Sequence, residues 1–319
     1  MLRYAIRRAG HGLLVLWAAF TATFFLLYVL PGDRALAKLG GDAGGTGFNA
    51  EQLAKLRTQL GLDDPVIVQY ARALWRAVQG DFGLSVQTGG DALRMFATGV
   101  PETLKLAAAG LFLGLVIGTT VALASALTGR PYLRRILQSV PVLGVSVPPF
   151  WVGLMLLQFV SFRWQLLPAM GNDGLASLVL PALTLSIPTA AVVAQILSRS
   201  LEGALRGAYI ETARSRGAGR ARLVFGHALR NGVLPMLTAL GMTTGHLIAG
   251  SVVIETVFSR SGIGLITVKA VTFQDTPLVL VAVVFAAGVF VVVNFLVDIL
   301  YPIIDPRIDL GRRPVEAAA

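Results

Sequence analysis

Long apolar runs dominate this chain and restrict it to one class of fold. Six of them are long enough to cross a membrane, and only 14% of the 319 residues are charged. A soluble domain of this length carries roughly a quarter charged residues. Crossing about 30 Å of hydrocarbon takes about twenty apolar residues in a helix, which satisfies every backbone hydrogen bond within its own segment. The sequence therefore predicts an all-α membrane protein with several spans.

The apolar runs predict six transmembrane helices, at residues 9–30, 102–127, 138–160, 178–198, 235–254 and 278–300. The first run is too long for the apolar part of a signal peptide, so we expect it to be a retained span. With six spans, both termini lie on one side, and the segments on that side hold 16 of the 27 Lys and Arg residues. Because short cytoplasmic loops are enriched in Lys and Arg, both termini are predicted to be cytoplasmic. The net charge of +10 then reflects membrane orientation, so nucleic acid is not an expected partner.

The predicted domains follow from these spans. They are 1–30, the cytoplasmic N-terminus and first span; 31–101, an extracytoplasmic helical insert; 102–301, the core with the other five spans and a cytoplasmic loop at 199–234; and 302–319, a cytoplasmic tail.

Turn and capping residues predict two helices within the insert. The first begins near Asn49 and stops at Gly61, and the second is capped by Asp64 and closes at Gly80. The second helix has apolar residues at helical spacing: Ile67, Tyr70, Leu74, Trp75 and Val78. The insert either packs on the spans as a small cap or receives an external partner, and the spacing leaves both open.

Residue types that carry catalysis or metal binding are scarce. The chain has no cysteine, and its three histidines are scattered at positions 11, 227 and 246. There is no Gly-rich loop ending in Gly-Lys-Ser/Thr and no Ser/His/Asp arrangement. We therefore expect no enzyme activity, no metal site and no cofactor bound by this chain. Driven transport would take its energy from another subunit or from a gradient.

Two of the predicted spans contain candidate pathway or gate residues. The third has a Pro-Pro pair, and proline removes a backbone donor and kinks a helix. The fifth contains GMTTGHLIAGS, whose small residues allow close helix contact. Helix packing and a pathway lining that shifts between two arrangements remain equally open. The candidates are Pro148, Pro149, Thr244, His246, Ser251 and Glu255.

The cytoplasmic loop at 199–234 is a short cationic segment whose seven basic residues are all arginine. The fourth span can continue as a helix to Arg214, before Gly217-Ala218-Gly219 breaks it. A second short helix is expected from Arg220, ending at Asn231-Gly232, before Pro235 starts the next span. A purely lipid-binding role favours a continuous basic amphipathic helix. A bent motif with Glu211 among arginines suits a groove on a protein partner better.

Residues of this loop resemble a known family. Glu211-Thr212-Ala213, followed after three residues by Gly217, resembles the EAA loop of bacterial ABC-importer permeases. The stretch HALRNGVLP is similar to the peptide branch of that family. Further motifs, in the same order, resemble the first permease of dipeptide, oligopeptide and nickel importers: LPGD at 30–33, GLDDP at 61–65, GDFGLS at 80–85, ETVFS at 255–259 and GIG at 262–264.

The resemblance implies a type I ABC importer permease in the bacterial inner membrane. Its implied partners are a second homologous permease, two ATP-binding subunits that hold the ATP and Mg²⁺, and an extracytoplasmic substrate-binding protein. The implied ATPase-coupling residues are Glu211, Thr212, Ala213, Gly217, Leu223 and Phe225.

Several alternatives stay open beside this resemblance. Peptide is the expected substrate, with nickel or another small solute as the alternative. A gradient-driven carrier is a hypothesis of a different class, and it needs an essential ionisable residue within the spans, which contain almost none. A structural membrane scaffold would need no pathway at all.

Overall fold

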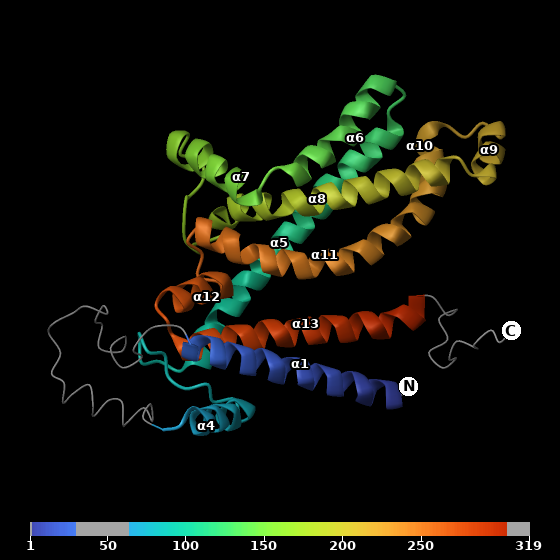
Figure 1. The fold of residues 1–319 in the computed structure, drawn as a ribbon. Helices are drawn as coiled ribbons and strands as arrows, with labels where there is room; N and C mark the ends of the chain where they lie inside the picture. The colour runs from blue at the N-terminus through green and yellow to red at the C-terminus, as the bar shows by residue number, and fades with distance from the viewer. Residues whose placement is uncertain (1, 30–63, 305–319) are drawn as a thin grey trace. The chain divides into compact units, whose positions relative to one another are not determined.

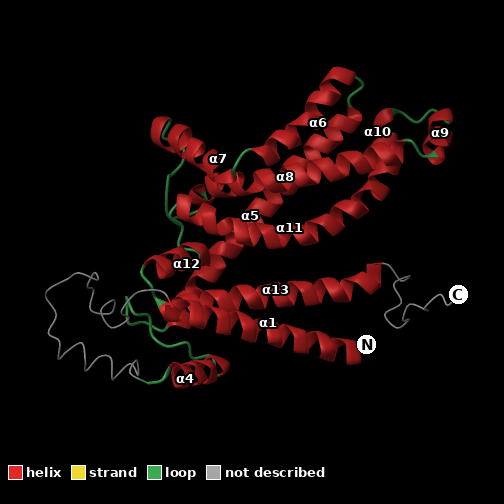
Figure 2. Cartoon of the chain, in the orientation of Figure 1, coloured by secondary structure: helices red, strands yellow, loops and turns green. Residues whose placement is uncertain are grey.

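The computed structural model describes residues 2–29 and 64–304, and within these ranges the chain is helical apart from turns and one isolated bridge between Leu84 and Asp91 (Figures 1 and 2). The predicted all-α class is therefore confirmed for this part of the chain. The helices are α1 (Leu2–Val29), α4 (Val66–Val78), α5 (Ala92–Leu127), α6 (Pro131–Ser146), α7 (Pro149–Leu156), α8 (Ala176–Leu205), α9 (Ala208–Ser215), α10 (Arg220–Leu223), α11 (Leu229–Val257), α12 (Ile263–Thr272) and α13 (Thr276–Ile304), with π-helical turns η1 (Leu157–Arg163) and η2 (Val224–Ala228).

Three of the described helices are long and apolar enough to cross a membrane. They are α1, through Gly10–Leu27, α5 and α8, and the bent pair of α6 with α7–η1 makes a fourth if it counts as one span. Shorter apolar stretches follow at Gly245–Val257, Ile263–Thr272 and Thr276–Val292. A membrane protein with several spans is thus supported, while the number six and the side of the termini stay predictions.

Prolines have opposite effects in two of the expected spans. The third is not one helix over 138–160, because Pro131–Ser146 and Pro149–Arg163 meet at 96°. Val147 and Pro148 have extended backbones, with ψ of 127° and 128°. The Pro-Pro pair removes two backbone donors and forces the preceding residue out of the α conformation, so the kink we expected is a complete break. In contrast, α5 continues through Pro101 and begins at Ala92, upstream of the predicted span.

The described chain divides into two compact units, residues 1–96 with 269–319 and residues 97–268. This division follows packing, and the predicted domain boundaries, which follow membrane topology, stay predictions. In the first unit α1 packs against α13. Phe20, Phe24 and Leu280 are buried there, and Tyr70 and Leu74 of α4 pack against them.

The helix α4 lies close to its predicted position. It starts at Val66 and is followed by Gly80 in a positive-φ conformation of +81°. The predicted cap was wrong, because the residue at the N-cap is Pro65 and Asp64 instead pairs with Arg72 at 3.0 Å. The other helix predicted in the insert, near 49–61, lies outside the described residues.

In the second unit, α8 is the central helix and packs against α6, α7 and α11. Glycines bring α5 close to it, at Gly110, Gly114 and Gly118. The tightest is Gly118, where a Cβ would lie 2.6 Å from the carbonyl oxygen of Ala190. Small residues four apart allow two helix backbones to approach in this way. In the small-residue stretch of the fifth span the result is mixed: a Cβ at Gly245 would meet no atom within 4 Å, whereas one at Gly250 would lie 3.5 Å from Leu185 of α8.

The cationic segment differs from the prediction in both halves: its first half is broken earlier, and its second half is more continuous. The helix α8 ends at Leu205 rather than Arg214, and α9 follows after an extended Gly207. From Arg220, α10, η2 and α11 follow one another directly to Val257, so Asn231-Gly232 does not end a helix and Pro235 lies inside α11. The reason is packing: Gly232 is buried, and a Cβ there would lie 3.2 Å from Leu201 of α8. This tertiary contact overrides the local preference for a turn.

Candidate functional site

Three of the six predicted coupling residues lie on α9, a short helix with one buried anchor. Ile210 is fully buried, whereas Glu211 and Thr212 are exposed and Ala213 is half-buried. The Thr212 hydroxyl donates to the carbonyl of Ala208 in the preceding turn, at 3.4 Å. The helix therefore holds the Glu211 side chain at the surface on a fixed backbone.

Gly217 ends α9 as predicted, through a left-handed residue. Its φ is +83°, its N–H donates to the carbonyl of Arg214 at 2.9 Å, and the N–H of Ala218 donates to the carbonyl of Ala213 at 3.1 Å. These bonds satisfy carbonyls that the end of a helix otherwise leaves unpaired. No heavy atom lies within 4 Å of a Cβ built there, so the backbone conformation rather than lack of space favours glycine.

The two apolar coupling candidates have different surroundings. Leu223 is 4% exposed and packs within the chain, whereas Phe225 is 52% exposed. Of this pair, only Phe225 offers surface to a partner. Tyr209, at 43% exposure, adds a second aromatic surface that the sequence analysis did not select. Its hydroxyl oxygen accepts a hydrogen bond from the Asn231 side chain at 3.3 Å.

Arginines line an open cavity of about 510 Å³ next to α9. Its lining residues are Arg134, Glu202, Leu205, Arg206, Arg214, Ala218, Arg220 and Leu223. Glu202 accepts hydrogen bonds from Arg134, at 2.8 Å, and from Gln138. The Nε of Arg220 donates to the carbonyl of Ala126 at 2.8 Å. These contacts fix α6 and α10 against the ends of α8 and α5, so the coupling residues have a rigid base.

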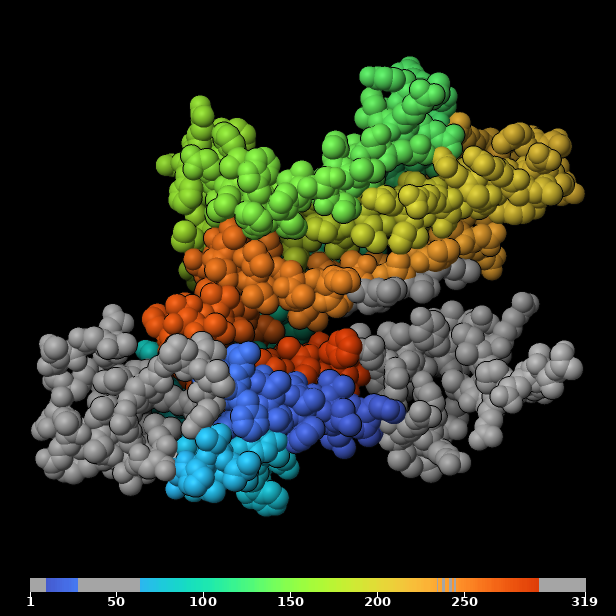
Figure 3. Space-filling model, viewed as in Figure 1, coloured from blue at the N-terminus to red at the C-terminus, as the bar shows by residue number. Residues whose placement is uncertain are grey.

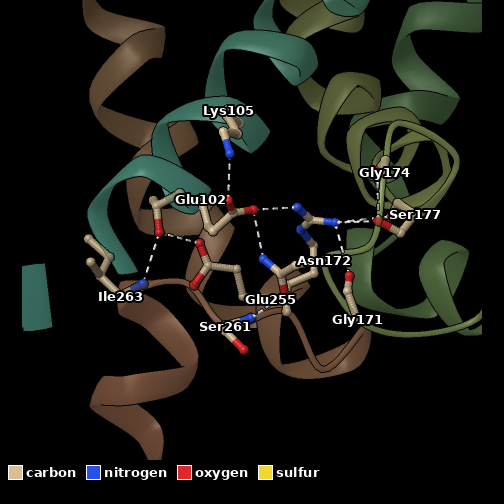
Figure 4. Close-up of polar contacts among 11 residues, drawn as sticks. Glu102, Lys105, Gly171, Asn172, Gly174, Ser177, Glu255, Ser261 and Ile263 are labelled. Carbon is tan, nitrogen blue, oxygen red and sulfur yellow. Dashed lines mark hydrogen bonds and ion pairs between the residues drawn. The ribbon is translucent and has the colours of Figure 1, made fainter. Parts of the chain in front are cut away.

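A second polar site surrounds Glu255, which is 1% exposed (Figure 4). Its carboxylate accepts three hydrogen bonds, from the Thr103 hydroxyl at 2.6 Å and from the backbone N–H groups of Gly264 at 2.7 Å and Leu265 at 3.3 Å. The Thr103 hydroxyl accepts the N–H of Ile263 at 2.9 Å. Together these side chains satisfy the first-turn donors of α12, where a negative charge is also favoured.

Arg260 ties the same loop to two other segments. It is 2% exposed, and it donates to the carbonyl oxygens of Gly171 and Ser177, both at 3.1 Å, and to the Glu102 carboxylate at 3.0 Å (Figure 4). Glu102 also accepts from Asn172 at 2.7 Å, and the side-chain oxygen of Asn172 accepts the N–H of Ser261 at 2.8 Å. The loop after α11 is therefore held both to the first third of α5 and to the turn before α8.

The two glycines of the GIG motif are explained by this packing. A Cβ on Gly262 would collide with the Glu255 carboxylate, and a Cβ on Gly264 would collide with the backbone of Val252. ETVFS and GIG thus form one capped turn. Glu255 was predicted from the sequence as a pathway candidate, whereas its neighbours in this site were not: Thr103, Glu102, Asn172 and Arg260. Charges at the ends of the spans were the only available signal for Glu102 and Arg260.

The other pathway candidates do not form one group. Pro148 and His246 are exposed and Pro149 is half-buried, while the Thr244 side chain lies outside the described part. Ser251 is buried and donates to the carbonyl of Ile248 in its own helix at 2.7 Å. Among the described residues, no group of three or more His, Cys, Asp or Glu could hold a metal ion. A pathway role for these candidates stays a prediction.

Sequence comparisons place the chain among transport proteins. Residues 100–310 match the family of binding-protein-dependent transport system inner membrane components, and residues 1–106 match the N-terminal family of the same membrane components. A probable peptide ABC transporter permease of Sinorhizobium fredii is 33% identical over 313 residues, covering 96% of this chain and 98% of that protein. The dipeptide transport system permease of Escherichia coli K12 is 31% identical over 340 residues, covering 97% and 99%.

A solved structure shares the fold. The MetNI methionine ABC transporter in an inward-facing conformation matches with a TM-score of 0.54 and 21% identity, over 66% of this chain and 96% of that one.

Proposed function

The chain belongs to the family of binding-protein-dependent transport system inner membrane components, and from this membership we propose that it is the permease subunit of an ATP-driven peptide importer. It is a multi-pass protein of the bacterial inner membrane. Relatives named as peptide and dipeptide permeases match it over nearly their full length, which supports peptide as the substrate class.

The observation that carries the coupling role is α9. This helix lies between an extended Gly207 and a left-handed Gly217, is anchored by buried Ile210, and presents Glu211 at its surface. A short helix bounded by two glycines and fixed by one apolar anchor can move as a rigid unit when a partner binds it. Phe225 and Tyr209 add exposed aromatic surface, which is common in protein interfaces.

We propose the remaining features as the family membership suggests them. The chain has six spans with both termini cytoplasmic, and it works beside a second homologous permease, two ATP-binding subunits and an extracytoplasmic substrate-binding protein. ATP and Mg²⁺ are held by the ATP-binding subunits, and this chain has no catalytic activity of its own.

The rival of a different class, a gradient-driven carrier, is disfavoured by the surroundings of two buried ionisable residues, Glu255 and Arg260. Glu255 already accepts three hydrogen bonds, and Arg260 is bound to Glu102 and two backbone carbonyls. A coupling site must instead release and rebind an ion or proton during each cycle. Both side chains are engaged in holding a turn together.

Reconstitution separates these functions. The chain is placed in proteoliposomes with its sister permease, the ATP-binding subunits and the binding protein, and uptake of a labelled dipeptide and of labelled nickel is measured with and without ATP. We expect ATP-dependent dipeptide uptake. Uptake of nickel alone would change the substrate, and uptake by this chain alone, indifferent to ATP, would exclude the importer.

The role of α9 is tested by Glu211→Lys, with Asp173→Lys as a control that makes the same charge change at an exposed position in the turn before α8. Reversing one charge at an interface costs a few kcal/mol, so we expect association with the ATP-binding subunits to weaken roughly tenfold or more. Membrane insertion should be unchanged in both variants. Unaltered co-purification of Glu211→Lys would count against docking through α9.

A further inference from the structure

The surface of α4 divides into three sectors, which is more than packing on α1 requires. Successive residues of an α-helix are rotated by about 100°, so each position can be assigned to a sector. One sector packs on α1, the second is apolar and exposed, and the third is polar. Figure 3 shows α4 at the surface beside α1.

The packed sector sets where α4 lies along α1. It consists of Val66, Tyr70, Ala73, Leu74 and Ala77, which pack on the cluster of Phe20, Phe24 and Leu280. The Tyr70 hydroxyl lies 2.8 Å from the Thr21 hydroxyl, and its ring contacts those of Phe24 and Phe25 at 5.5 and 5.6 Å. These contacts place α4 beside the C-terminal half of the apolar stretch Gly10–Leu27.

The exposed apolar sector is built from large side chains. Ile67, Trp75 and Val78 are 72%, 67% and 75% exposed, and they fall within about a quarter turn of one another. At the same depth α1 itself exposes Phe25 and Leu26, by 39% and 62%, and Phe25 contacts the Tyr70 ring. Scattered apolar residues are common at protein surfaces, but three large ones on one sector, beside a stretch of α1 that is itself apolar and exposed, point to an apolar environment.

The polar sector lies between the apolar sector and the other edge of the packed sector. It contains Gln69, Arg72, Arg76 and Gln79. Arg72 pairs with Asp64 at 3.0 Å and Arg76 with Asp81 at 2.8 Å, and about half of each arginine side chain is exposed. Arginine at this position can extend its charged end from the edge of an apolar layer into water or toward lipid phosphates.

We propose that α4 lies in the membrane interface, in the leaflet at the C-terminal end of α1. Ile67, Trp75 and Val78 contact the acyl chains, while Arg72 and Arg76 face the headgroups. Three observations favour lipid: the depth set by Tyr70, the exposed apolar Phe25 and Leu26 of α1 at that depth, and the arginines along the sector edge. An amphipathic helix with tryptophan on its apolar face and arginine on its polar face is typical of such interfaces. The inference depends on α1 spanning the membrane and is independent of the transported substrate.

The absence of cysteine from the chain allows a direct test. Single cysteines replace Ile67, Trp75 or Val78 on the apolar sector, and Gln69 or Gln79 on the polar sector, and each carries a nitroxide label. The full chain is reconstituted in vesicles of phosphatidylethanolamine and phosphatidylglycerol. Collision rates are then measured with oxygen, which concentrates in lipid, and with a water-soluble nickel chelate.

We expect the first three labels to collide mainly with oxygen and the last two mainly with the nickel chelate, so the order of the two rates reverses between the sectors. Frequent nickel collisions at the apolar positions would show a surface in water and overturn the proposal. Low rates with both reagents, in this chain or in its complex with the sister permease, would show a protein cover and overturn it equally. If a labelled variant does not fold, exposed Ala71 in the same sector replaces it. No transport is measured, so failure here and failure of the proposed function are distinguishable.

Discussion

Glu255→Gln tests whether one carboxylate holds the start of α12. The substitution keeps the shape of the side chain but leaves one oxygen acceptor where there were two. In the native protein one carboxylate oxygen accepts the N–H groups of Gly264 and Leu265, and the other accepts the Thr103 hydroxyl. Glutamine can retain the first pair only by turning its NH₂ group toward Thr103. That hydroxyl already accepts the N–H of Ile263, and its own hydrogen would lose its present acceptor.

The magnitude follows from these three bonds. A hydrogen bond to a charged group contributes about 1.5–3 kcal/mol and a neutral one about 0.5–1.5 kcal/mol. The two retained bonds should therefore weaken by about 1 kcal/mol each, and the lost hydroxyl bond, which is also made to the carboxylate, should cost about 2 kcal/mol. Removing a buried charge also relieves its desolvation cost, which offsets about 1 kcal/mol. We expect Glu255→Gln to lower the free energy of unfolding by about 3 kcal/mol. Thr103→Val should be less costly when combined with Glu255→Gln than in the native protein, because the two residues share one bond.

Two measurements check this expectation. Equilibrium unfolding by SDS in mixed micelles gives the free energy, and hydrogen exchange reports the protection of the backbone N–H groups at 263–265. Ser251→Ala is the control, because the contact described for this buried hydroxyl is to the Ile248 carbonyl in its own helix. This substitution should lower the free energy of unfolding by about 1 kcal/mol. A Glu255→Gln variant within about 0.5 kcal/mol of the native protein, with unchanged exchange at 263–265, would refute the capping role, because that is the range of ordinary surface substitutions.

Two further substitutions test local geometry. Gly217→Ala should lower the free energy of unfolding by about 1–2 kcal/mol, because alanine is strained at a φ of +83°. The same substitution should weaken binding to the ATP-binding subunits. Gly203→Ala is the control: this glycine lies in a right-handed helix with open space around it, so the substitution should be neutral or stabilising by up to about 1 kcal/mol. Asp275→Asn should destabilise by about 1–2 kcal/mol, since the buried carboxylate accepts both the Ser85 hydroxyl and the N–H of Val86, the latter at 3.2 Å. In the double variant, Ser85→Ala should add little to the loss caused by Asp275→Asn, because the two residues share one hydrogen bond. Fully additive losses in the SDS assay would contradict this shared contact.

Features determined by neighbouring residues were predictable from the sequence. The apolar runs gave the helical class, and Gly217 ended α9 because a left-handed residue is a local requirement. The position of α4 followed from Pro65 and Gly80. The break at Pro148 was foreseen as a kink, and its size of 96° depends on the packing of the two halves.

Features determined by distant residues were not predictable. The capping of α12 joins Glu255 to Thr103 across 152 residues, and no local pattern indicates that pairing. The turn expected at Asn231-Gly232 is absent because Gly232 packs on α8. Leu223 is a large apolar residue in the cationic segment, as a docking residue would be, but only the fold shows that it is buried within the chain.

The helices α10, η2 and α11 form one continuous run from Arg220 to Val257, and such a run can transmit movement along its length. At about 1.5 Å per residue it is about 55 Å long, which exceeds the thickness of the hydrocarbon layer. One end adjoins α9 and the other carries the carboxylate that caps α12. With α11 as one of the six spans we propose, a displacement of the coupling segment would be transmitted along one helix to the turn that Glu255 caps, and this helix can bend at the π-helical turn η2 and at Pro235. Substitutions that make η2 or Pro235 more rigid should change how much of this displacement reaches Glu255. The contacts at the two ends of the run should stay the same.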